Sequence, residues 1–337
     1  MNLRPRPNPR PNPRPNPRPR IVYSRHYNIS FLGLERLHPF DSRKYGRAYR
    51  ALQRRFGRDL KRRMLRPPRP VTREELLWVH TPQYLARLRD PAYVAGALEI
   101  PQLRRVPGFI LDRVILRRMR WATAGTILAA REAMTCGLAI NLSGGYHHAG
   151  PDRGEGFSIY NDIALAVHGL RRDGRLSDDD RIVYVDCDAH QGNGVCRAFA
   201  DDNRVFIYDL YNAAIYPRDA EARRRIDCDV PLSPNQIDSE YLAKLTSTLP
   251  PFLDGISKSA LPAFAIYNAG TDIFRGDPLG ALAVTAAGVL KRDCFVLNQL
   301  LERGIPTIML PSGGYTQESF QLIADTVVDV LQTWPEL

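Results

Sequence analysis

The sequence predicts an α/β domain in which a mainly parallel β-sheet is covered by helices on both faces. Apolar runs of strand length alternate with helical stretches from residue 21 to the end, and no domain linker interrupts the series. Several runs are apolar throughout, as expected for strands buried on both faces. With 337 residues and 44% hydrophobic content, the chain is long enough for one large domain.

Each predicted strand ends in a polar, often Gly-rich segment. Open α/β sheets bind ligands at the carboxyl ends of their strands, so we expect the functional residues to lie there. The expected strands are residues 21–23, 138–142, 181–185, 205–208, 264–267 and 306–310. The expected helices are residues 45–57, which carry a basic face, and residues 73–80, 121–136, 161–172, 238–249 and 285–303.

The first 20 residues differ in composition from the rest. From residue 4 they alternate Pro with Arg and Asn, a pattern that lacks backbone donors and favours extended polyproline II conformation. We therefore expect residues 1–20 to form a disordered tail and residues 21–337 to form the folded domain. The tail is either a tether for an acidic partner or a linker.

Charge, hydropathy and cysteine content narrow the class of protein. Six arginines of the tail contribute to a formal net charge of +11, and no nucleic-acid-binding motif accompanies them, so we expect no specific nucleic-acid partner. The sequence contains no apolar run of membrane-span length and no signal-peptide pattern, which predicts a cytoplasmic protein. Its five scattered cysteines argue against a disulfide framework.

The strongest single feature is the strand 181–185 followed by Asp186, Asp188 and His190. Side chains at alternate positions of an extended chain point to the same face, so these three groups share one side of the strand end. Carboxylate and imidazole ligands suit a borderline metal such as zinc. Taken alone, the Asp-x-Asp pattern is more often that of a loop whose aspartates cap the next helix, and the other segments below shift the balance towards a metal site.

Three further strand ends carry groups of related chemistry. His147 and His148 follow a Gly-Gly turn and suit a site with two bases. Asp272 ends another strand and completes a three-ligand set with Asp188 and His190, whose open coordination positions indicate catalysis. Tyr315 follows a third Gly-rich turn, where its phenol can stabilise an oxyanion.

Together these segments resemble the zinc-dependent histone deacetylase superfamily, whose α/β fold is shared with arginases, and most closely its class IV members. The resemblance extends from residue 21 to the end of the chain. The motifs that carry it are Asp188-Ala-His-Gln-Gly-Asn-Gly194, residues 205–212 with Ile215-Tyr-Pro217, residues 267–273 with Gly276-Asp277, and residues 21–24 with His38-Pro-Phe-Asp41.

The resemblance implies a role for each catalytic position. Asp188, His190 and Asp272 would hold Zn²⁺, although Fe²⁺ suits the same ligands. His148 would be the general base and later the acid, and His147, oriented by Asp186, its electrostatic partner. Tyr315 would donate to the tetrahedral oxyanion. Asn193 stands where class I members have Asp, and since an amide stabilises an imidazolium less than a carboxylate does, we expect His148 to be a weaker base.

The resemblance also implies a substrate channel and a second ion. Gly156, Phe157, Tyr216 and Leu279 would line the acyl-lysine channel, although Leu279 is as readily explained as plain core. A structural K⁺ would lie at Asp186, Asp188, His190, Asp209 and Leu210, held largely by backbone carbonyls.

The function that follows is a metal-dependent hydrolase that removes acyl groups, either acetyl or longer fatty acyl, from the ε-amine of lysine in proteins or peptides. A competing hypothesis is an amidohydrolase of acetylpolyamines or another small-molecule amide, for which Asp152 and Glu155 would form an acidic gate. A catalytically silent acyl-lysine binder and an arginase-like dimanganese hydrolase are two more hypotheses. The dimanganese reaction needs carboxylates that bridge two metals, which a single Asp-His-Asp set does not provide.

Overall fold

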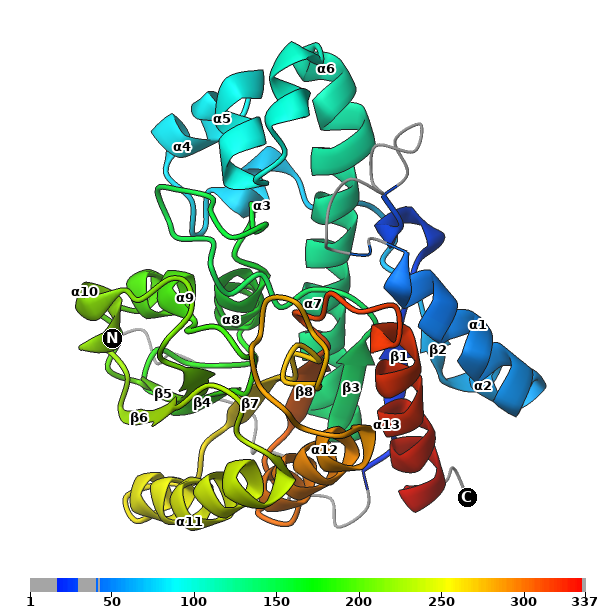
Figure 1. Cartoon of the computed structure of the whole chain (residues 1–337), viewed down its shortest axis with the longest axis vertical. Helices are drawn as coiled ribbons and strands as arrows, with labels where there is room; N and C mark the ends of the chain where they lie inside the picture. The colour runs from blue at the N-terminus through cyan, green and yellow to red at the C-terminus, as the bar shows by residue number, and fades with distance from the viewer. Residues whose placement is uncertain (1–16, 30–40, 42, 335–337) are drawn as a thin grey trace, which may run out of the picture.

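The fold is that of an eight-stranded sheet in which every pair of neighbouring strands is parallel. This computed structural model describes residues 17–29, 41 and 43–334. The strand order is β2-β1-β3-β8-β7-β4-β5-β6, with helices on both sides of the sheet (Figure 1). The predicted α/β class and its mainly parallel sheet are confirmed.

Six strands lie where the sequence predicts them, with small differences at their ends. They are β1 (Arg20–Val22), β3 (Leu138–Asn141), β4 (Ile182–Asp186), β5 (Val205–Asn212), β7 (Phe264–Asn268) and β8 (Thr307–Leu310). The edge strands β2 (Met64–Leu65) and β6 (Cys228–Leu232) were not predicted. β2 has two residues, too few for a pattern. β6 contains Pro231, which a sheet tolerates at an edge.

The helices cover most of the expected ranges and several more. They are α1 (Lys44–Phe56), α2 (Arg58–Arg63), α3 (Arg73–Leu76), α4 (Pro82–Arg87), α5 (Pro91–Ala97), α6 (Gly108–Leu111), α7 (Arg117–Cys136), α8 (Asp162–Arg172), α9 (Asn193–Ala198), α10 (Ala220–Arg223), α11 (Asp238–Ser257), α12 (Ala286–Leu301) and α13 (Ser319–Thr333). The predicted helix 73–80 is shorter, ending as α3 at Leu76.

Helix α11 continues eight residues beyond the predicted end at 249, through Pro250 and Pro251. Leu245, Leu249 and Leu253 are each fully buried, so the apolar face runs across the prolines. Burial of that face outweighs the backbone hydrogen bonds that proline removes. Helix α13 was not predicted, although its buried side chains repeat at helical spacing.

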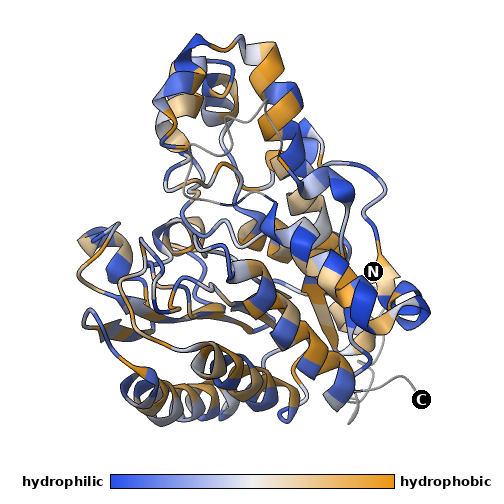
Figure 2. Cartoon of the chain, turned by 45° about the vertical axis from the view of Figure 1, so that its right-hand side comes forward, coloured by the Kyte–Doolittle hydropathy of each residue, from blue (hydrophilic) through white to orange (hydrophobic). Residues whose placement is uncertain are grey.

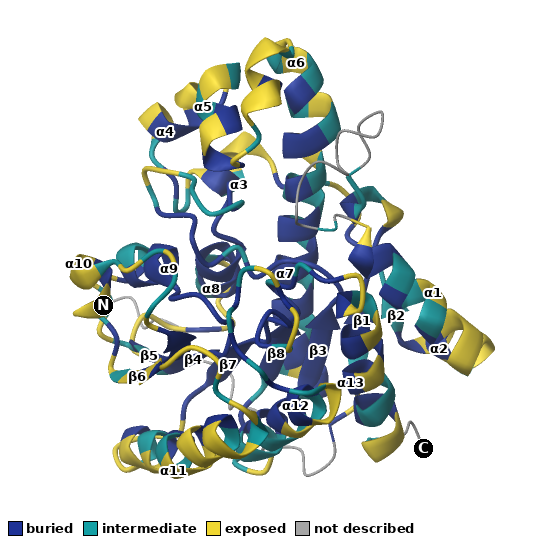
Figure 3. Cartoon of the chain, viewed as in Figure 1, coloured by how far each residue is buried: buried dark blue, intermediate teal, exposed yellow. Residues whose placement is uncertain are grey.

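Two apolar layers enclose the sheet. Within β4, Val183 and Val185 belong to an apolar cluster that includes residues of α1, α11, α12 and α13, while Ile182 and Tyr184 belong to a second cluster that includes residues of α7, α8 and α9. Figure 2 shows apolar colouring on strands and along faces of the helices, and Figure 3 shows the central strands buried while the outer helices keep exposed faces. The strands therefore form a rigid platform whose carboxyl ends carry the loops.

A third apolar cluster joins α3, α4 and α5 to α6 and the first half of α7, at the end of the molecule drawn uppermost in Figure 1. At the N-terminus, strand β1 begins one residue before the predicted domain boundary, and the Arg18 N–H donates to the Cys136 carbonyl at 2.8 Å. Residues 1–16 of the predicted tail and His38-Pro-Phe40 lie outside the described residues. No helix of the described part is long and apolar enough to cross a membrane.

Candidate active site

Strand register brings the predicted site residues together. Asp186, the last residue of β4, pairs with Asn268 at the end of β7 and with Asp209 in β5. The loops that follow β4 and β7 therefore start level with each other. Asp188 lies two residues into the first loop and Asp272 four residues into the second, so both carboxylates meet over the same sheet edge.

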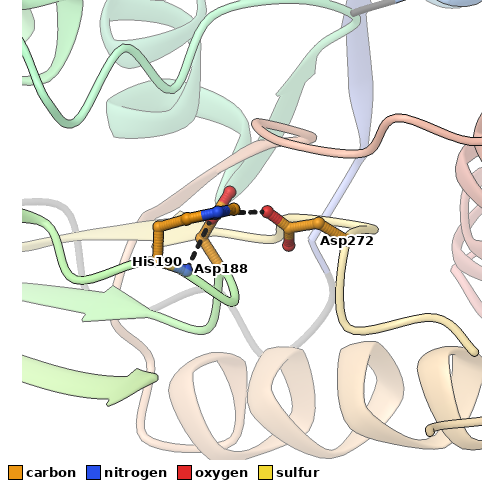
Figure 4. A group of neighbouring side chains, drawn as sticks. All are labelled: Asp188, His190 and Asp272. Atoms are coloured by element: carbon orange, nitrogen blue, oxygen red, sulfur yellow. Dashed lines mark hydrogen bonds and ion pairs between the residues drawn. The ribbon is translucent and has the colours of Figure 1, made fainter. Parts of the chain in front are cut away.

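Asp188, His190 and Asp272 form a buried cluster in which a ligand-type atom of each lies within 4.8 Å of the others. His190 Nδ1 is 3.1 Å from Asp188 Oδ1 and 3.0 Å from Asp272 Oδ2 (Figure 4). Two carboxylates converging with one imidazole are the donor set that Zn²⁺ or Fe²⁺ accepts. The predicted three-ligand set is therefore assembled and fits a metal ion.

Glycines and backbone donors shape this cluster. A Cβ at Gly270 would lie 2.3 Å from Asp188 Oδ2, and one at Gly313 would lie 2.3 Å from Asp272 Oδ2, so neither position admits a larger residue without movement. The Gly313 N–H donates to Asp188 Oδ2 at 2.8 Å, and the Ala189 N–H donates to Asp272 Oδ1 at 2.9 Å. Both carboxylates are thus held in place by the backbone.

Arg292 of α12 connects the loop after β4 to the loop after β7. Its side chain is fully buried, and Nη1 donates to the Cys187 carbonyl at 3.0 Å and to the Gly270 carbonyl at 2.6 Å. The guanidinium is compensated by Asp293, whose Oδ1 lies 2.8 Å from Nη2. One buried cation therefore fixes the backbone on both sides of the cluster.

His147 is paired with a buried carboxylate. Its Nδ1 lies 2.8 Å from Asp186 Oδ2, and Asp186 also accepts from Asn268 Nδ2 at 2.9 Å. Burial opposes a charge on the ring, but the carboxylates of Asp186 and Asp188 outweigh it and raise the pKa of His147 to about 9.

His148 has the opposite electrostatic environment. Burial, followed by the neighbouring His147 and His190, holds the pKa of His148 well below its usual range. Nδ1 lies 2.8 Å from Asn193 Oδ1, and the ring centroids of His147 and His148 are 4.1 Å apart. The two imidazoles therefore lie side by side with pKa values shifted in opposite directions.

Tyr315 faces the cluster from the glycine loop after β8. Its ring centroid lies 6.0 Å from that of His190, edge to face, and its backbone N–H donates to Asp277 Oδ2 at 2.7 Å. The loop before it is held by the fully buried Lys44, whose Nζ donates to the carbonyls of Ser312, Gly313 and Gly314 at 2.7, 2.8 and 3.2 Å. Burial lowers the pKa of Lys44 to about 8, against the opposing effect of nearby carboxylates.

Aromatic rings flank the histidines and the tyrosine. Phe157 lies 5.8 Å from Tyr315 and Tyr216 lies 5.1 Å from His148, both edge to face between centroids. Gly156 has φ +52°, and a Cβ there would lie 2.5 Å from the His148 ring. Three of the four predicted channel residues therefore adjoin the site. Leu279 is half-buried, with its N–H donating to Asp277 Oδ1 at 3.0 Å, and its channel role stays a prediction.

The predicted K⁺ site contains a buried carboxylate with an unused oxygen. Asp209 is fully buried, and its Oδ2 accepts from the Gly192 N–H at 2.9 Å. Its Oδ1 has no hydrogen-bond partner among the described residues. Burial, then the charge of Asp186, raises the pKa of Asp209 well above its usual range. An orphaned oxygen on such a group fits a bound cation.

Comparison with known proteins identifies the relatives of this fold and site. The histone deacetylase domain matches residues 38–331. The chain belongs to the histone deacetylase family. It is 41% identical over 321 residues to histone deacetylase 2 of Arabidopsis thaliana, covering 94% of this chain and 81% of that protein. Histone deacetylase 8 of Xenopus tropicalis is 28% identical over 267 residues, covering 74% and 67%. The crystal structure of the HDA15 HD domain, at 22% identity, shares the fold with a TM-score of 0.73, covering 93% and 90%.

As a histone deacetylase family member, the chain is a hydrolase of the lysine deacetylase type. Four residues that support the site were not among the predicted ones: Lys44, Asn268, Asp277 and Arg292. Arg292 had a sequence signal, because it lies three residues after Val289 and four before Val296 on the apolar face of a predicted helix. Lys44 had no comparable signal, since its acceptors follow 268 residues later.

Proposed function

We propose that the chain removes acyl groups, acetyl or longer, from the ε-amine of lysine in proteins or peptides with Zn²⁺ as its metal. The observation that carries the proposal is the convergence of a three-ligand cluster, a neutral imidazole and a phenol on one buried point. Fe²⁺ remains compatible with the same ligands. Asn193, in place of the carboxylate of class I members, supports assignment to class IV.

Asp188, His190 and Asp272 would hold the metal. A zinc ion held there would supply Lewis acidity toward the amide carbonyl and would lower the pKa of a bound water to about 7. These ligands are buried and oriented by backbone N–H groups, so the site needs little rearrangement to receive an ion.

His148 acts as general base. Its depressed pKa keeps the ring neutral at working pH, and Nε2, the nitrogen that does not face Asn193, takes the water proton. The same nitrogen then gives that proton to the departing lysine amine. His147, charged and paired with Asp186, promotes this second transfer, because a cation 4.1 Å away between centroids disfavours a second charge on His148.

Tyr315 donates its phenolic proton in a hydrogen bond to the oxyanion of the tetrahedral intermediate. Burial, then the carboxylates of Asp188 and Asp272, raises the pKa of Tyr315 well above its usual range, so the phenol stays protonated. A donor aimed at developing charge contributes more in the transition state than in the ground state.

The substrate stem passes between Phe157 and Tyr216, with Gly156 giving the close approach to His148 and Leu279 contributing to the wall. Aromatic walls suit both the lysine methylenes and a longer acyl chain. A K⁺ ion at Asp209, Leu210 and the backbone of the Asp186–His190 segment would neutralise the Asp209 carboxylate.

The acetylpolyamine hypothesis receives no support from the proposed acidic gate. Asp152 Oδ1 lies 3.0 Å from the guanidinium of Arg153, and Glu155 Oε1 lies 2.6 Å from that of Arg197. Carboxylates that are already paired with arginine attract a polycation weakly.

The test is amide hydrolysis of matched lysine peptides carrying acetyl, octanoyl or myristoyl groups, with acetylspermidine in parallel. Zinc-reconstituted wild type is compared with His148→Ala and Tyr315→Phe. Turnover of the peptides that both substitutions abolish or strongly depress is the expected result, and the chain-length ranking identifies the acyl group. Turnover of acetylspermidine alone would replace the proposal by the small-molecule hypothesis.

A further inference from the structure

The amide of Asn193 bridges two groups of very different charge. Its Oδ1 lies 2.8 Å from His148 Nδ1, and its Nδ2 donates to Glu155 Oε1 at 3.0 Å. Asn193 is 1% exposed, so bulk solvent could not replace a hydrogen bond that its amide would lose in the wrong orientation. The two contacts together decide which way the amide points.

We propose that Glu155 is a positioning residue that fixes the amide of Asn193 and, through it, places the imidazole proton of His148 on Nδ1. This inference rests on the proposed role of His148 as the base.

The donors and acceptors of the three side chains fix the orientation of the amide. An ionised carboxylate only accepts hydrogen bonds, so the Asn193 group that faces Glu155 must be the NH₂. The amide oxygen then faces His148, and since it only accepts, the ring nitrogen Nδ1 must carry the proton. Nε2 is left with a free lone pair, which is what a base requires. If Glu155 were absent, the amide could turn and donate to Nδ1, which would leave the proton on Nε2 and block the base.

Two features hold Glu155 in this role. The Arg197 guanidinium lies 2.6 Å from the same Oε1 and also pairs with Asp219, which keeps a cation beside the carboxylate. Arg197 follows Asn193 by one helical turn of α9, so both partners of Glu155 come from one rigid element.

The backbone of Glu155 is equally constrained. Its N–H donates to the Ser158 carbonyl at 3.1 Å, and the Ser158 N–H donates back at 2.9 Å. Gly156 and Phe157 between them have φ +52° and +65°, the left-handed pair of a tight hairpin turn. The turn that presents Phe157 beside Tyr315 therefore also presents Glu155 to Asn193.

This arrangement places a carboxylate one amide away from the general base. A direct test exchanges the two partners. Asn193→Asp alone sets two carboxylates against each other, whereas Asn193→Asp with Glu155→Gln restores one donor and one acceptor in reversed order. A purely structural ion pair between Glu155 and Arg197 would give no such rescue.

The experiment measures kcat and KM on an acyl-lysine peptide with zinc-loaded enzyme. We expect Glu155→Ala to lower kcat by about tenfold or more, within the roughly 10²–10⁴-fold that a general base contributes, with KM changed less than about twofold. Asn193→Asp should be at least about tenfold slower than the double variant. The control is Asp173→Ala, which removes a surface carboxylate paired with Arg131 at 2.6 Å and should leave kcat unchanged.

A second readout follows the tautomer itself. In zinc-loaded enzyme with ¹⁵N-labelled histidine, assigned with His148→Ala, the His148 signals should show the proton on Nδ1 in wild type and on Nε2 in Glu155→Ala. Wild-type kcat in Glu155→Ala, or failure of the double variant to exceed Asn193→Asp, would overturn the inference. Full turnover in His148→Ala would instead remove the proposed base, so the two failures are distinguishable.

Discussion

Replacing Arg292 by Met tests how strongly one buried cation organises the ligand loops. The side chain is fully buried and serves the carbonyls of Cys187 and Gly270 as well as Asp293. Met fills a similar volume but leaves both carbonyls and the carboxylate without that partner. Breaking a buried ion pair from one side costs about 3–5 kcal/mol, a large part of the roughly 5–15 kcal/mol that stabilises a typical domain.

The substitution should therefore lower the free energy of unfolding, measured by urea denaturation of the zinc-loaded enzyme, by about 3–5 kcal/mol. Asp293 still accepts hydrogen bonds from Tyr267 Oη at 2.5 Å and from Thr326 Oγ1 at 2.6 Å. These bonds keep its carboxylate partly compensated, so the loss of stability should lie near the lower end of that range. Zinc affinity should also fall by about 10–100-fold, since partners of this kind orient metal ligands.

Two variants control this prediction. Arg303→Met removes a pair with Asp254, whose side chain is 63% exposed, and should cost less than about 1 kcal/mol. Arg292→Met with Asp293→Asn removes the unpaired charge and should recover part of the loss. Stability of Arg292→Met within about 1 kcal/mol of wild type, or no recovery in the double variant, would refute the assigned cause.

Four further predictions follow. Tyr315→Phe should lower kcat by about 10²–10³-fold with unchanged zinc content, measured by turnover and metal analysis, because only the oxyanion donor is lost. Burial lowers the pKa of His80 from its ordinary 6.5 to about 4, so the unfolded state binds the proton first as pH falls. The free energy of unfolding therefore decreases as the pH falls from about 6.5 to about 4, with about 2 kcal/mol lost between pH 7 and pH 5. Urea titrations at several pH values should show that the stability of His80→Gln depends less on pH than that of wild type. Gly156→Ala should abolish most turnover because its Cβ would meet the His148 ring, whereas Gly174→Ala, also at positive φ but with nothing within 4 Å, should keep it. Removing zinc with a chelator should lower the melting temperature, and added zinc should restore it.

The proximity of Asp188, His190 and Asp272 was predictable because it depends on local pattern. An apolar strand followed by carboxylate and imidazole at alternate positions is readable in one window, and parallel strand ends meet at one sheet edge. Asp188 and His190 lie in one such window, and Asp272 lies in the loop after a strand that neighbours theirs. The register of β4 with β7 then brings the two loops level with each other.

The supporting contacts were not predictable, because they join distant segments. Lys44 bonds to a loop 268 residues later, and Glu155 reaches Asn193 across 38 residues. Nothing near Glu155 in the sequence distinguishes an acceptor for a buried amide from a gate for a polycation, and the acidic-gate interpretation followed from that ambiguity. The short edge strand β2 was missed for a related reason, since two residues carry no periodicity.

The charge balance of the buried centre favours a bound cation. The chain as a whole is basic, at +11, yet four carboxylates, those of Asp186, Asp188, Asp209 and Asp272, lie at or below 1% exposure around the site. Lys44 is the one buried lysine among the described residues, and it donates to carbonyls rather than to these carboxylates. Buried anions are costly unless a cation compensates them. His147 pairs with Asp186, whereas Asp209 keeps an oxygen without a hydrogen-bond partner among the described residues, so a cation bound at the site would compensate the remaining carboxylates.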